Sequence, residues 1–445
     1  MRTTYQDCAV ATVDPNHSRY ADGHVVVDEG RVVAVGPGRY PGNADRVVSL
    51  PGCLATPGLV NTHHHLYQWA TRGLAQDDNL FGWLTALYPR WARLDAAVVR
   101  ATTRAGLAWL ALSGCTTSTD HLYVHPAGAG DLFAEQVRAA GEIGLRFHPC
   151  RGSMDLGASR GGLPPDAVVE STDRALAATA EAIDTFHDGT PDSMLRVAVA
   201  PCSPFSVSEE LMRESAALAR DRGVRLHTHL AETLEEERYC FERFGCDPVA
   251  YAEKLGWLGD DVWLAHATHL PPTAIARVAL TGTAVAHCPS SNARLGAGVA
   301  PVAELLRAGV PVGLGVDGPA SQEAGRLGAE LRQALLMARA VGGPQALNVD
   351  DVLALATIGG ARCLGRAAEI GSLEPDKLAD VTFWDLTGLG HAGITDPVAA
   401  LVLGPSAPVR LLLVAGRPVV EHGLLATADV DELVAGLLRT SRRLA

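Results

Sequence analysis

The chain has 445 residues, 47% of them hydrophobic, and a formal net charge of -13 at pH 7. Such a chain can bury a large core, and its negative charge argues against nucleic acid or an anionic membrane surface as a partner. A small, neutral or weakly anionic substrate is more natural. No apolar run is long enough to span a bilayer, and the first residues lack the apolar region of a signal peptide, so we expect a cytoplasmic protein.

The cysteines and lysines of the chain indicate the state of its thiols and limit the kinds of metal site that it can form. The nine cysteines show no C-x-x-C pair and their number is odd, which predicts reduced and mostly buried thiols. Lys254 and Lys377 are the only lysines. The carbamylated lysine that bridges the two ions of some barrel hydrolases would have to lie between His65 and His229, where the chain has none. A two-metal site of that kind is therefore excluded.

Both ends of the chain contain strand patterns. Residues 24–27 and 31–35 alternate around a turn at residues 28–30, which predicts a hairpin. Residues 378–384 and 409–414 look like further strands of the same small sheet. We therefore predict a composite β-sandwich domain from residues 1–55 and 366–430, followed by a C-terminal surface helix and basic tail at residues 431–445.

Residues 56–365 alternate short apolar strands with longer helical patterns, which is typical of repeated βα units. The eight candidate strands are residues 58–60, 116–119, 145–148, 196–199, 225–229, 262–266, 284–287 and 312–317. Polar residues gather where these strands end. The pattern predicts an α/β fold, a (β/α)8 TIM-like barrel whose chemistry lies at the carboxyl ends of its strands.

Four residues at strand ends form a candidate metal site. His63 and His65 are two positions apart, so a strand would place both imidazoles on one face. His229 and Asp317 end later strands and complete a nitrogen and oxygen ligand set that suits Zn²⁺ with an open position for water, although Fe²⁺ or Mn²⁺ would also be accepted. Each residue alone would more often be structural, such as a turn-capping aspartate. Together they predict a metal centre.

Acid–base residues accompany these ligands. Glu232 lies three residues after His229, where it can reach the water without binding the metal, and we predict that it passes a proton from the water to a ring nitrogen of the substrate. The same position suits an acid near the start of a helix at residues 233–237. His266 would hydrogen-bond the attacking hydroxide or the leaving group, and Asp317 would accept a proton while binding the metal.

A site that binds a planar polar ring requires apolar walls and a few fixed hydrogen-bond donors, and candidates for both can be chosen from the sequence. Gln68 and Trp69 lie in the aromatic-rich segment after His65 and are the best pocket candidates. Helical spacing assigns a further group to the core instead, namely Leu84, Leu87, Tyr88 and Trp91.

Three more polar residues follow other strands. Arg151 could bind a ring carbonyl through its fork of donors or could form a salt bridge. His121 and Ser203 stand at the ends of two further strands, where they are additional candidates for substrate contacts.

The sequence resembles the amidohydrolase superfamily, and within it the aminohydrolases that act on ring amines, such as triazine hydrolases and adenosine-type deaminases. The resemblance covers nearly the whole chain and rests on residues 57–65, residues 229–232, His266, Asp317 and the closing segment 371–380. It implies a single metal ion, usually zinc, and hydrolytic release of ammonia or another leaving group from an sp² ring carbon.

A finer resemblance involves the group of 8-oxoguanine deaminases. It rests on residues 63–68, 114–123, 151–157, 161–166 and 287–292. This resemblance implies deamination of a fused nitrogen heterocycle, converting 8-oxoguanine to urate and ammonia.

One loop departs from that group. Pro319, Gln322 and Glu323 stand where the group would have Ser, Asn and Asp, and the loop at residues 316–323 should border the pocket. Alternative reactions therefore stay open: deamination of isoxanthopterin or guanine, or amino- or chlorohydrolysis of an s-triazine. Symmetric association is common among enzymes of this kind, so we also expect a homo-oligomer.

Overall fold

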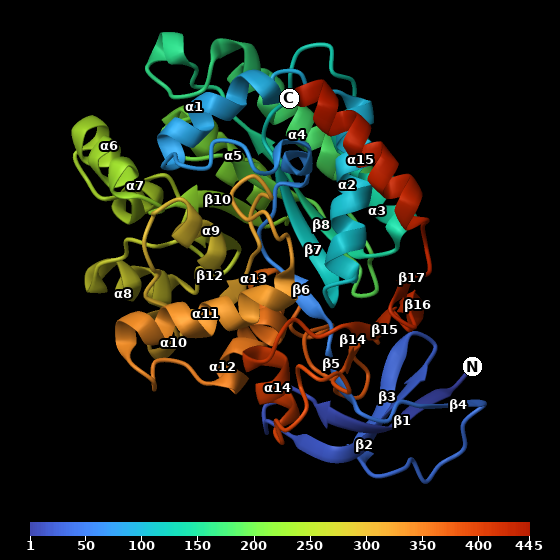
Figure 1. The fold of residues 1–445 in the computed structure, drawn as a ribbon. Coiled ribbons are helices and arrows are strands. Elements are labelled where there is room, and N and C mark those ends of the chain that lie inside the picture. The colour runs from blue at the N-terminus through green and yellow to red at the C-terminus, as the bar shows by residue number, and fades with distance from the viewer.

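Eight parallel strands form a nearly closed barrel in the computed structural model, which describes all residues 1–445 (Figure 1). They follow one another in chain order: β6 (Leu59–Asn61), β7 (Cys115–Leu122), β8 (Arg146–Ser153), β9 (Ala198–Pro201), β10 (Leu226–Leu230), β11 (Val262–His266), β12 (Ala284–His287) and β13 (Val312–Leu314). The Thr62 amide donates to the carbonyl of Leu314 at 2.9 Å and links the first strand to the last. The predicted (β/α)8 fold is confirmed.

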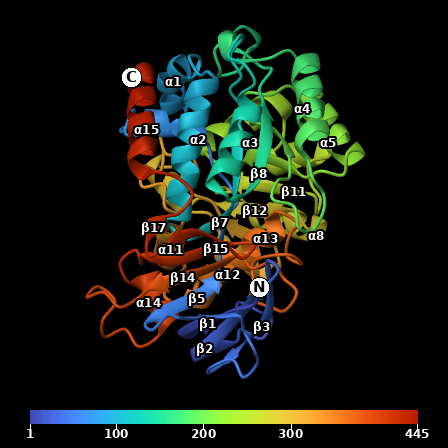
Figure 2. The ribbon, with the colours of Figure 1, turned by 90° about the vertical axis from the view of Figure 1, so that its right-hand side faces the viewer.

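Helices surround the barrel or cover its ends (Figures 1 and 2). Their bounds are α1 (Leu80–Trp91), α2 (Ala96–Ala111), α3 (Leu132–Ile143), α4 (Thr172–Phe186), α5 (Glu209–Asp221), α6 (Leu234–Phe244), α7 (Pro248–Lys254), α8 (Pro272–Thr281), α9 (Pro289–Arg294), α10 (Val302–Arg307), α11 (Leu327–Gly342), α12 (Val349–Ala354) and α13 (Gly360–Cys363). Short turns of helix lie at η1 (Leu66–Thr71), η2 (Ala158–Arg160), η3 (Asp166–Val168) and η4 (Leu355–Gly359).

The two chain ends share a second sheet, which lies below the barrel in both ribbon views. Its strands are β1 (Thr3–Ala11), β2 (Arg19–Asp28), β3 (Arg31–Pro37), β4 (Arg46–Ser49), β5 (Cys53–Pro57), β14 (Val381–Asp385), β15 (Val409–Val414), β16 (Arg417–Glu421) and β17 (Leu424–Leu425). Strand β14 pairs antiparallel with β5 and joins the ends, while β2 and β3 form the predicted hairpin. A separate core forms around Tyr5, Val25, Phe383 and Leu413.

A buried ion pair fastens this sheet to the barrel. Arg146 opens β8, and its Nε and Nη2 donate to the two carboxylate oxygens of Asp380 at 2.9 and 3.0 Å. Both side chains are almost fully inaccessible to solvent. The backbone amide of Ala415 donates to the same carboxylate at 2.8 Å, so the segment entering β14 is held from two sides.

Replacing Arg146 by methionine should reduce the free energy of unfolding by about 3–5 kcal/mol, because Asp380 would remain as a buried, unpaired charge. Urea denaturation measures this loss. The matched control is Arg220→Met, whose pair with Asp261 is largely solvent-exposed and should contribute less than about 1 kcal/mol. Equal losses in the two variants would contradict the role given to the buried pair.

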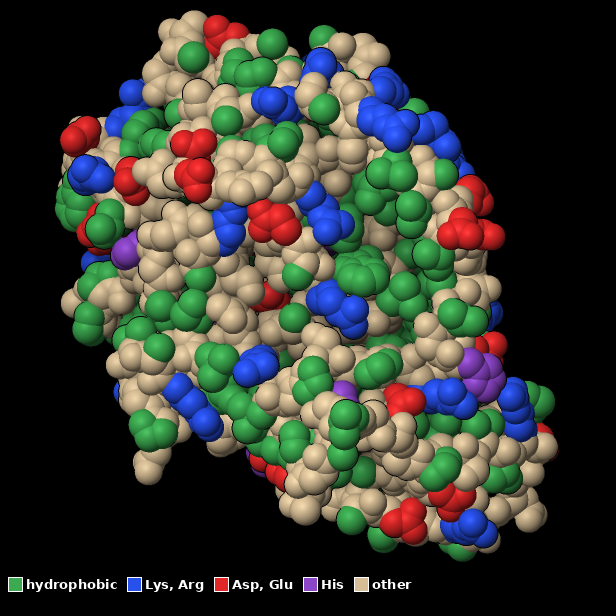
Figure 3. Space-filling model, viewed as in Figure 1, with side chains coloured by type: hydrophobic (Ala, Val, Ile, Leu, Met, Phe, Trp, Pro, Cys, Tyr) green, Lys and Arg blue, Asp and Glu red, His purple; other side chains and the backbone are tan.

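The last helices complete the fold. α14 (Pro397–Leu403) precedes β15. α15 (Val430–Leu444) packs against α2 and η1, and it lies beside α2 in both ribbon views. No helix in the chain combines the length and the apolar composition that a membrane span needs. On the face seen in Figure 3, acidic and basic side chains are interspersed. The expected homo-oligomeric state and cytoplasmic location stay predictions.

All nine cysteines are unpaired thiols, and all except Cys246 are buried. Their burial agrees with the expectation that the thiols are mostly inaccessible. Burial raises the pKa of the Cys202 thiol, which lies beside the metal ligands, to about 12. That thiol is therefore neutral and does not act as a thiolate ligand.

Candidate metal centre and active site

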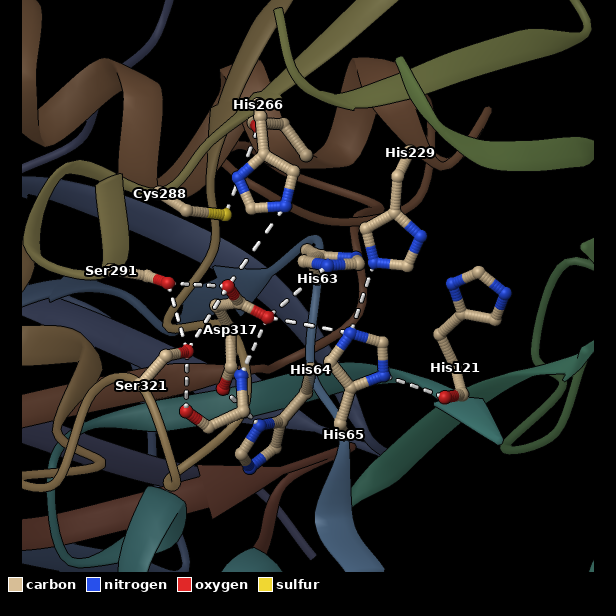
Figure 4. Close-up of polar contacts among 12 residues, drawn as sticks. His63, His64, His65, His121, His229, His266, Cys288, Ser291, Asp317 and Ser321 are labelled. Atoms are coloured by element: carbon tan, nitrogen blue, oxygen red, sulfur yellow. Dashed lines mark hydrogen bonds and ion pairs between the residues drawn. The ribbon is translucent and has the colours of Figure 1, made fainter. Parts of the chain in front are cut away.

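Three histidines and one aspartate meet at the carboxyl ends of the barrel strands (Figure 4). His63 and His65 follow β6, His229 lies in β10 and Asp317 follows β13. Nε2 of His65 lies 3.1 Å from Nε2 of His229, and Oδ1 of Asp317 lies 3.4 Å from Nε2 of both His63 and His65. The structure thus brings together the four ligands that the sequence predicted.

Hydrogen bonds fix the protons of two of these imidazoles. Nδ1 of His65 donates to the carbonyl of His121, and Nδ1 of His229 donates to the carbonyl of Cys202, each at 2.7 Å. A carbonyl only accepts, so both neutral rings carry their lone pairs on Nε2. Burial lowers the pKa of both His65 and His229, which keeps them neutral. Lone pairs 3.1 Å apart repel, and a cation between them removes the repulsion.

Asp317 supplies the carboxylate of the centre. Its Oδ2 accepts a hydrogen bond from Ser291 Oγ at 2.5 Å, and its Oδ1 accepts one from the Gly318 amide at 2.7 Å. Burial raises the pKa of the Asp317 carboxyl, but its contacts with His63, His266 and His65 outweigh burial and hold that pKa well below its usual value. The group is therefore an anionic ligand at neutral pH.

The backbone bends sharply where the strands end at this centre. Ala231 after β10, His266 and Ala267 at the end of β11, and Asp317 after β13 have φ values of 54°, 70°, 48° and 63°. Residues other than glycine rarely adopt this left-handed region, at a cost of about 1–3 kcal/mol each. At this rim the bends redirect the chain so that the side chains of His266 and Asp317 face the centre.

Glu232 and His266 lie next to the ligands. Oε2 of Glu232 is 3.7 Å from Nε2 of His266, whose Nδ1 donates to Asn292 Oδ1 at 2.8 Å. Burial raises the pKa of Glu232 to about 7, with the neighbouring His266 lowering it and Asp317 raising it. A carboxyl group with that pKa can both accept and release a proton at neutral pH. The backbone amide of Glu232 donates to Glu236 at 3.0 Å, which holds the loop in place.

A cavity adjoins the centre. Glu232, His266 and Asp317 contribute its polar surface. Its apolar walls come from helix α1 and from the segments after β7 and β9, with Trp83, Leu84, Tyr88, Tyr123 and Phe205. A flat ring with a few polar edges matches this lining.

Gln68 presents a free amide to the cavity. Both Oε1 and Nε2 are buried and neither has a partner within the protein. Such atoms cost free energy unless a ligand supplies the missing hydrogen bonds. Gly318 lies against this amide, since a Cβ at that position would come within 1.8 Å of Oε1. Only glycine leaves room here for the amide of Gln68.

Of two other substrate-binding candidates, Ser203 lines the cavity and His121 does not. The hydroxyl of Ser203 is 2.7 Å from that of Ser206. His121 lies behind the cavity, where its ring stacks on His229 with centroids 4.9 Å apart and its Nε2 donates to the carbonyl of Ala200. Its nitrogen joins a group with three metal ligands whose ligand atoms all lie within 4.8 Å of one another.

Arg151 and Trp69 do not line the cavity. Strand β8 continues to Ser153, and alternation along it turns Arg151 to the outer face of the barrel. There its guanidinium donates to both carboxylate oxygens of Glu170 at 2.8 and 2.9 Å, the salt-bridge alternative. Trp69 packs against α2 near Gly106, with the guanidinium of Arg72 4.6 Å from its ring centroid.

Sequence reasoning also missed cavity residues. Helical spacing assigned Leu84 and Tyr88 to the core, but both face the cavity from α1. Periodicity identifies the buried face of a helix and does not distinguish a packed core from a binding cavity. Ser291, which hydrogen-bonds Asp317, comes from α9 and carried no local signal of its role.

A (β/α)8 barrel with neutral histidines and an aspartate converging at its carboxyl end, next to a buried acid of near-neutral pKa, defines a metal-dependent hydrolase. The model of the amidohydrolase family matches residues 54–419, and the chain belongs to that family.

Known proteins resemble the chain over most of its length. It is 43% identical over 425 residues to 8-oxoguanine deaminase of Pseudomonas aeruginosa, covering 93% of each chain. It is 37% identical over 428 residues to hydroxydechloroatrazine ethylaminohydrolase of Pseudomonas sp., covering 92% of this chain and 88% of the relative. The crystal structure of atrazine chlorohydrolase from Arthrobacter aurescens complexed with zinc matches with a TM-score of 0.94 and 34% identity, covering 99% of this chain and 100% of that one.

The donor set and the zinc-bound structural relative identify zinc as the metal. His63, His65 and His229 would bind it through Nε2 and Asp317 through its carboxylate. A bound zinc ion acts as a Lewis acid that brings the pKa of water toward neutrality. Fe²⁺ or Mn²⁺ in its place stays a prediction.

Proposed function

We propose that the protein deaminates 8-oxoguanine to urate and ammonia with one molecule of water. The observation that carries this proposal is the Gln68 amide, which offers an unpaired donor and an unpaired acceptor to the cavity that Glu232 also lines. A lactam edge, an N–H beside a C=O, matches such an amide. In 8-oxoguanine this edge adjoins the ring carbon that bears the amino group, and the similarity to 8-oxoguanine deaminase supports the same choice.

Three side chains of the cavity have separate roles in the proposed reaction, namely Gln68, Glu232 and His266. Gln68 orients the lactam edge so that the amino-bearing carbon faces Glu232. Glu232 accepts a proton from the attacking water and transfers it to the ring nitrogen beside that carbon. Burial lowers the pKa of His266, but the charges of Glu232 and Asp317 outweigh burial and raise it, which favours the protonated ring. With Nδ1 bonded to Asn292, its Nε2, 3.7 Å from Glu232 and 3.9 Å from Asp317, can then donate a hydrogen bond to the incoming oxygen. The second proton of that water then passes to the amino group, the carbon–nitrogen bond breaks, ammonia leaves, and the new oxygen stays on the ring carbon as a carbonyl.

Two alternative substrates share the same lactam edge. Guanine and isoxanthopterin both carry an amino group beside an N–H and a C=O, so the amide of Gln68 would accept either ring. A hydroxylated s-triazine losing an alkylamine, or a chlorotriazine losing chloride, would use the same metal and acid with another leaving group. The similarity to the two triazine-converting relatives keeps these reactions open.

Substrate turnover by the zinc-loaded protein tests the proposal. We would compare kcat/KM for 8-oxoguanine, guanine, isoxanthopterin, a hydroxylated aminotriazine and a chlorotriazine, recording ammonia, chloride and urate. The proposal predicts the highest value for 8-oxoguanine, with one ammonia per urate. A higher value for another amine would move the specificity to that ring, and chloride release without ammonia would reject the deaminase assignment.

Gln68→Leu should lower kcat/KM for the preferred ring by about 10- to 100-fold, since one or two hydrogen bonds of about 1–2 kcal/mol each are lost. Leucine keeps the volume, so zinc content should not change. Gln345→Leu, an exposed site distant from the cavity, serves as control. Wild-type kcat/KM in the Gln68 variant would remove its role in ring binding.

A further inference from the structure

His227 links a metal ligand to the barrel interior and has no part in the chemistry above. It lies in β10, two residues before His229, and is fully buried. Its Nε2 is 2.8 Å from Nδ1 of His63, and its own Nδ1 is 2.8 Å from the backbone carbonyl of Trp263. A continuous line of hydrogen bonds therefore runs from Trp263 through His227 to His63.

The backbone carbonyl of Trp263 determines which atoms donate along this line of hydrogen bonds. The carbonyl of Trp263 can only accept, so Nδ1 of His227 carries a proton. One proton lies between His227 and His63. If it sat on His227, the Nε2 of a neutral His63 would carry the other hydrogen and could not bind a metal. If His227 is the acceptor, Nδ1 of His63 is the donor and its Nε2 presents a lone pair to the centre.

Packing leaves His227 little freedom to change this arrangement. Residues 227 and 263 are neighbours in the register of β10 and β11, and their rings stack with centroids 4.4 Å apart at 17°. The indole N–H of Trp263 donates to the carbonyl of Thr62 at 3.0 Å, the residue directly before His63. Trp263 thus holds both the ring of His227 and the backbone that carries His63.

We propose that His227 is a positioning residue of the metal centre, a neutral acceptor, oriented by Trp263, that holds His63 in the tautomer and orientation needed to bind zinc. The other two histidine ligands donate to fixed backbone carbonyls, at 2.7 Å in both cases. His63 alone depends on a side chain for this hydrogen bond. The inference rests on the zinc site and not on the choice of ring substrate.

Three variants test the proposal without any substrate. His227→Phe keeps a flat ring on Trp263 and removes the acceptor, whereas His227→Gln keeps an acceptor oxygen. His148→Phe is the matched control, because His148 is also buried beside Trp263, with centroids 5.8 Å apart, and has no hydrogen bond to a metal ligand. Zinc affinity is measured by competition with a chromophoric chelator, and the visible spectrum of the cobalt-loaded protein reports the ligand geometry.

We expect His227→Phe to bind zinc about 10- to 100-fold more weakly and to show an altered cobalt spectrum. His227→Gln should retain most of the affinity, and His148→Phe all of it. Unchanged affinity and spectrum in His227→Phe would overturn the proposal, as would an equal loss in His148→Phe or a glutamine variant no better than the phenylalanine one.

If His227→Phe does not fold, ring ¹⁵N spectroscopy of the zinc-loaded wild-type protein shows which ring nitrogen of His227 carries the proton. The resonances of His227 are assigned by their absence from His227→Gln. A protonated Nδ1 with an unprotonated Nε2 supports the proposal, and a protonated Nε2 overturns it. Neither measurement depends on turnover, so a wrong substrate assignment and a wrong role for His227 give different results.

Discussion

Glu232→Gln should lower kcat by about 10²- to 10⁴-fold while the protein keeps its zinc. The amide has nearly the same size and cannot accept the proton of the attacking water. Glu232 is only 3% exposed and lies beside His266, not among the four ligands. Single-turnover rates measure the loss, and metal analysis measures the zinc content.

The matched control for this prediction is Glu235→Gln, three residues further on in α6 and partly exposed. It should keep wild-type turnover. A near-normal rate in Glu232→Gln would remove the proton transfer from this residue. Loss of zinc in that variant would mean that Glu232 acts as a ligand or holds one.

Removing the metal should have the second large effect. A chelator should abolish turnover and lower the melting temperature, because Nε2 of His65 and Nε2 of His229 then face each other at 3.1 Å without a cation. Zinc at about 1,000 times its Kd contributes about 4 kcal/mol to the stability of the folded state. Turnover and thermal unfolding are measured before and after adding zinc back.

Magnesium is the control cation in that experiment, since it prefers an octahedral set of oxygen ligands and should restore neither property. Full turnover by the metal-free protein would contradict the metal-dependent mechanism. Equal recovery with magnesium would contradict the assignment of a nitrogen-rich zinc site.

The metal ligands could be predicted because each one is tied to the end of a strand. His63 and His65 have the two-residue spacing of one strand face, and His229 and Asp317 end apolar runs of their own. In a parallel barrel all such ends meet at one rim, so strand order alone brings together residues more than 200 positions apart. The local pattern was sufficient here because it also determines the global arrangement.

Other parts of the site depend on features that local patterns do not contain. The role of Arg151 turned on how far β8 extends, since a strand that continues past residue 148 sends this side chain outward to Glu170. The cavity position of Tyr88 could not be predicted, because helical spacing shows that the side chain is buried but not that a cavity lies against its helix. His227 was found only through distances to His63 and Trp263, contacts that no spacing within β10 reveals.

The loop that departs from the 8-oxoguanine deaminase pattern is mostly structural. Gln322 donates to Glu330 at 2.6 Å, and Glu323 accepts from Arg294 at 3.1 Å. Asp317 and Ser321 are the residues of this loop that line the cavity. Gln322 and Glu323 therefore hold the loop in place through these hydrogen bonds, and neither residue lines the cavity.

Turnover during a zinc titration tests the central claim most directly. Metal-free protein would receive zinc from zero to two equivalents, with ammonia and urate from 8-oxoguanine recorded at each step. One hydrolytic metal centre predicts that both products rise together and level off at one zinc per chain. Activity without zinc, a plateau only at two equivalents, or zinc-dependent loss of substrate without ammonia would contradict a mononuclear deaminase.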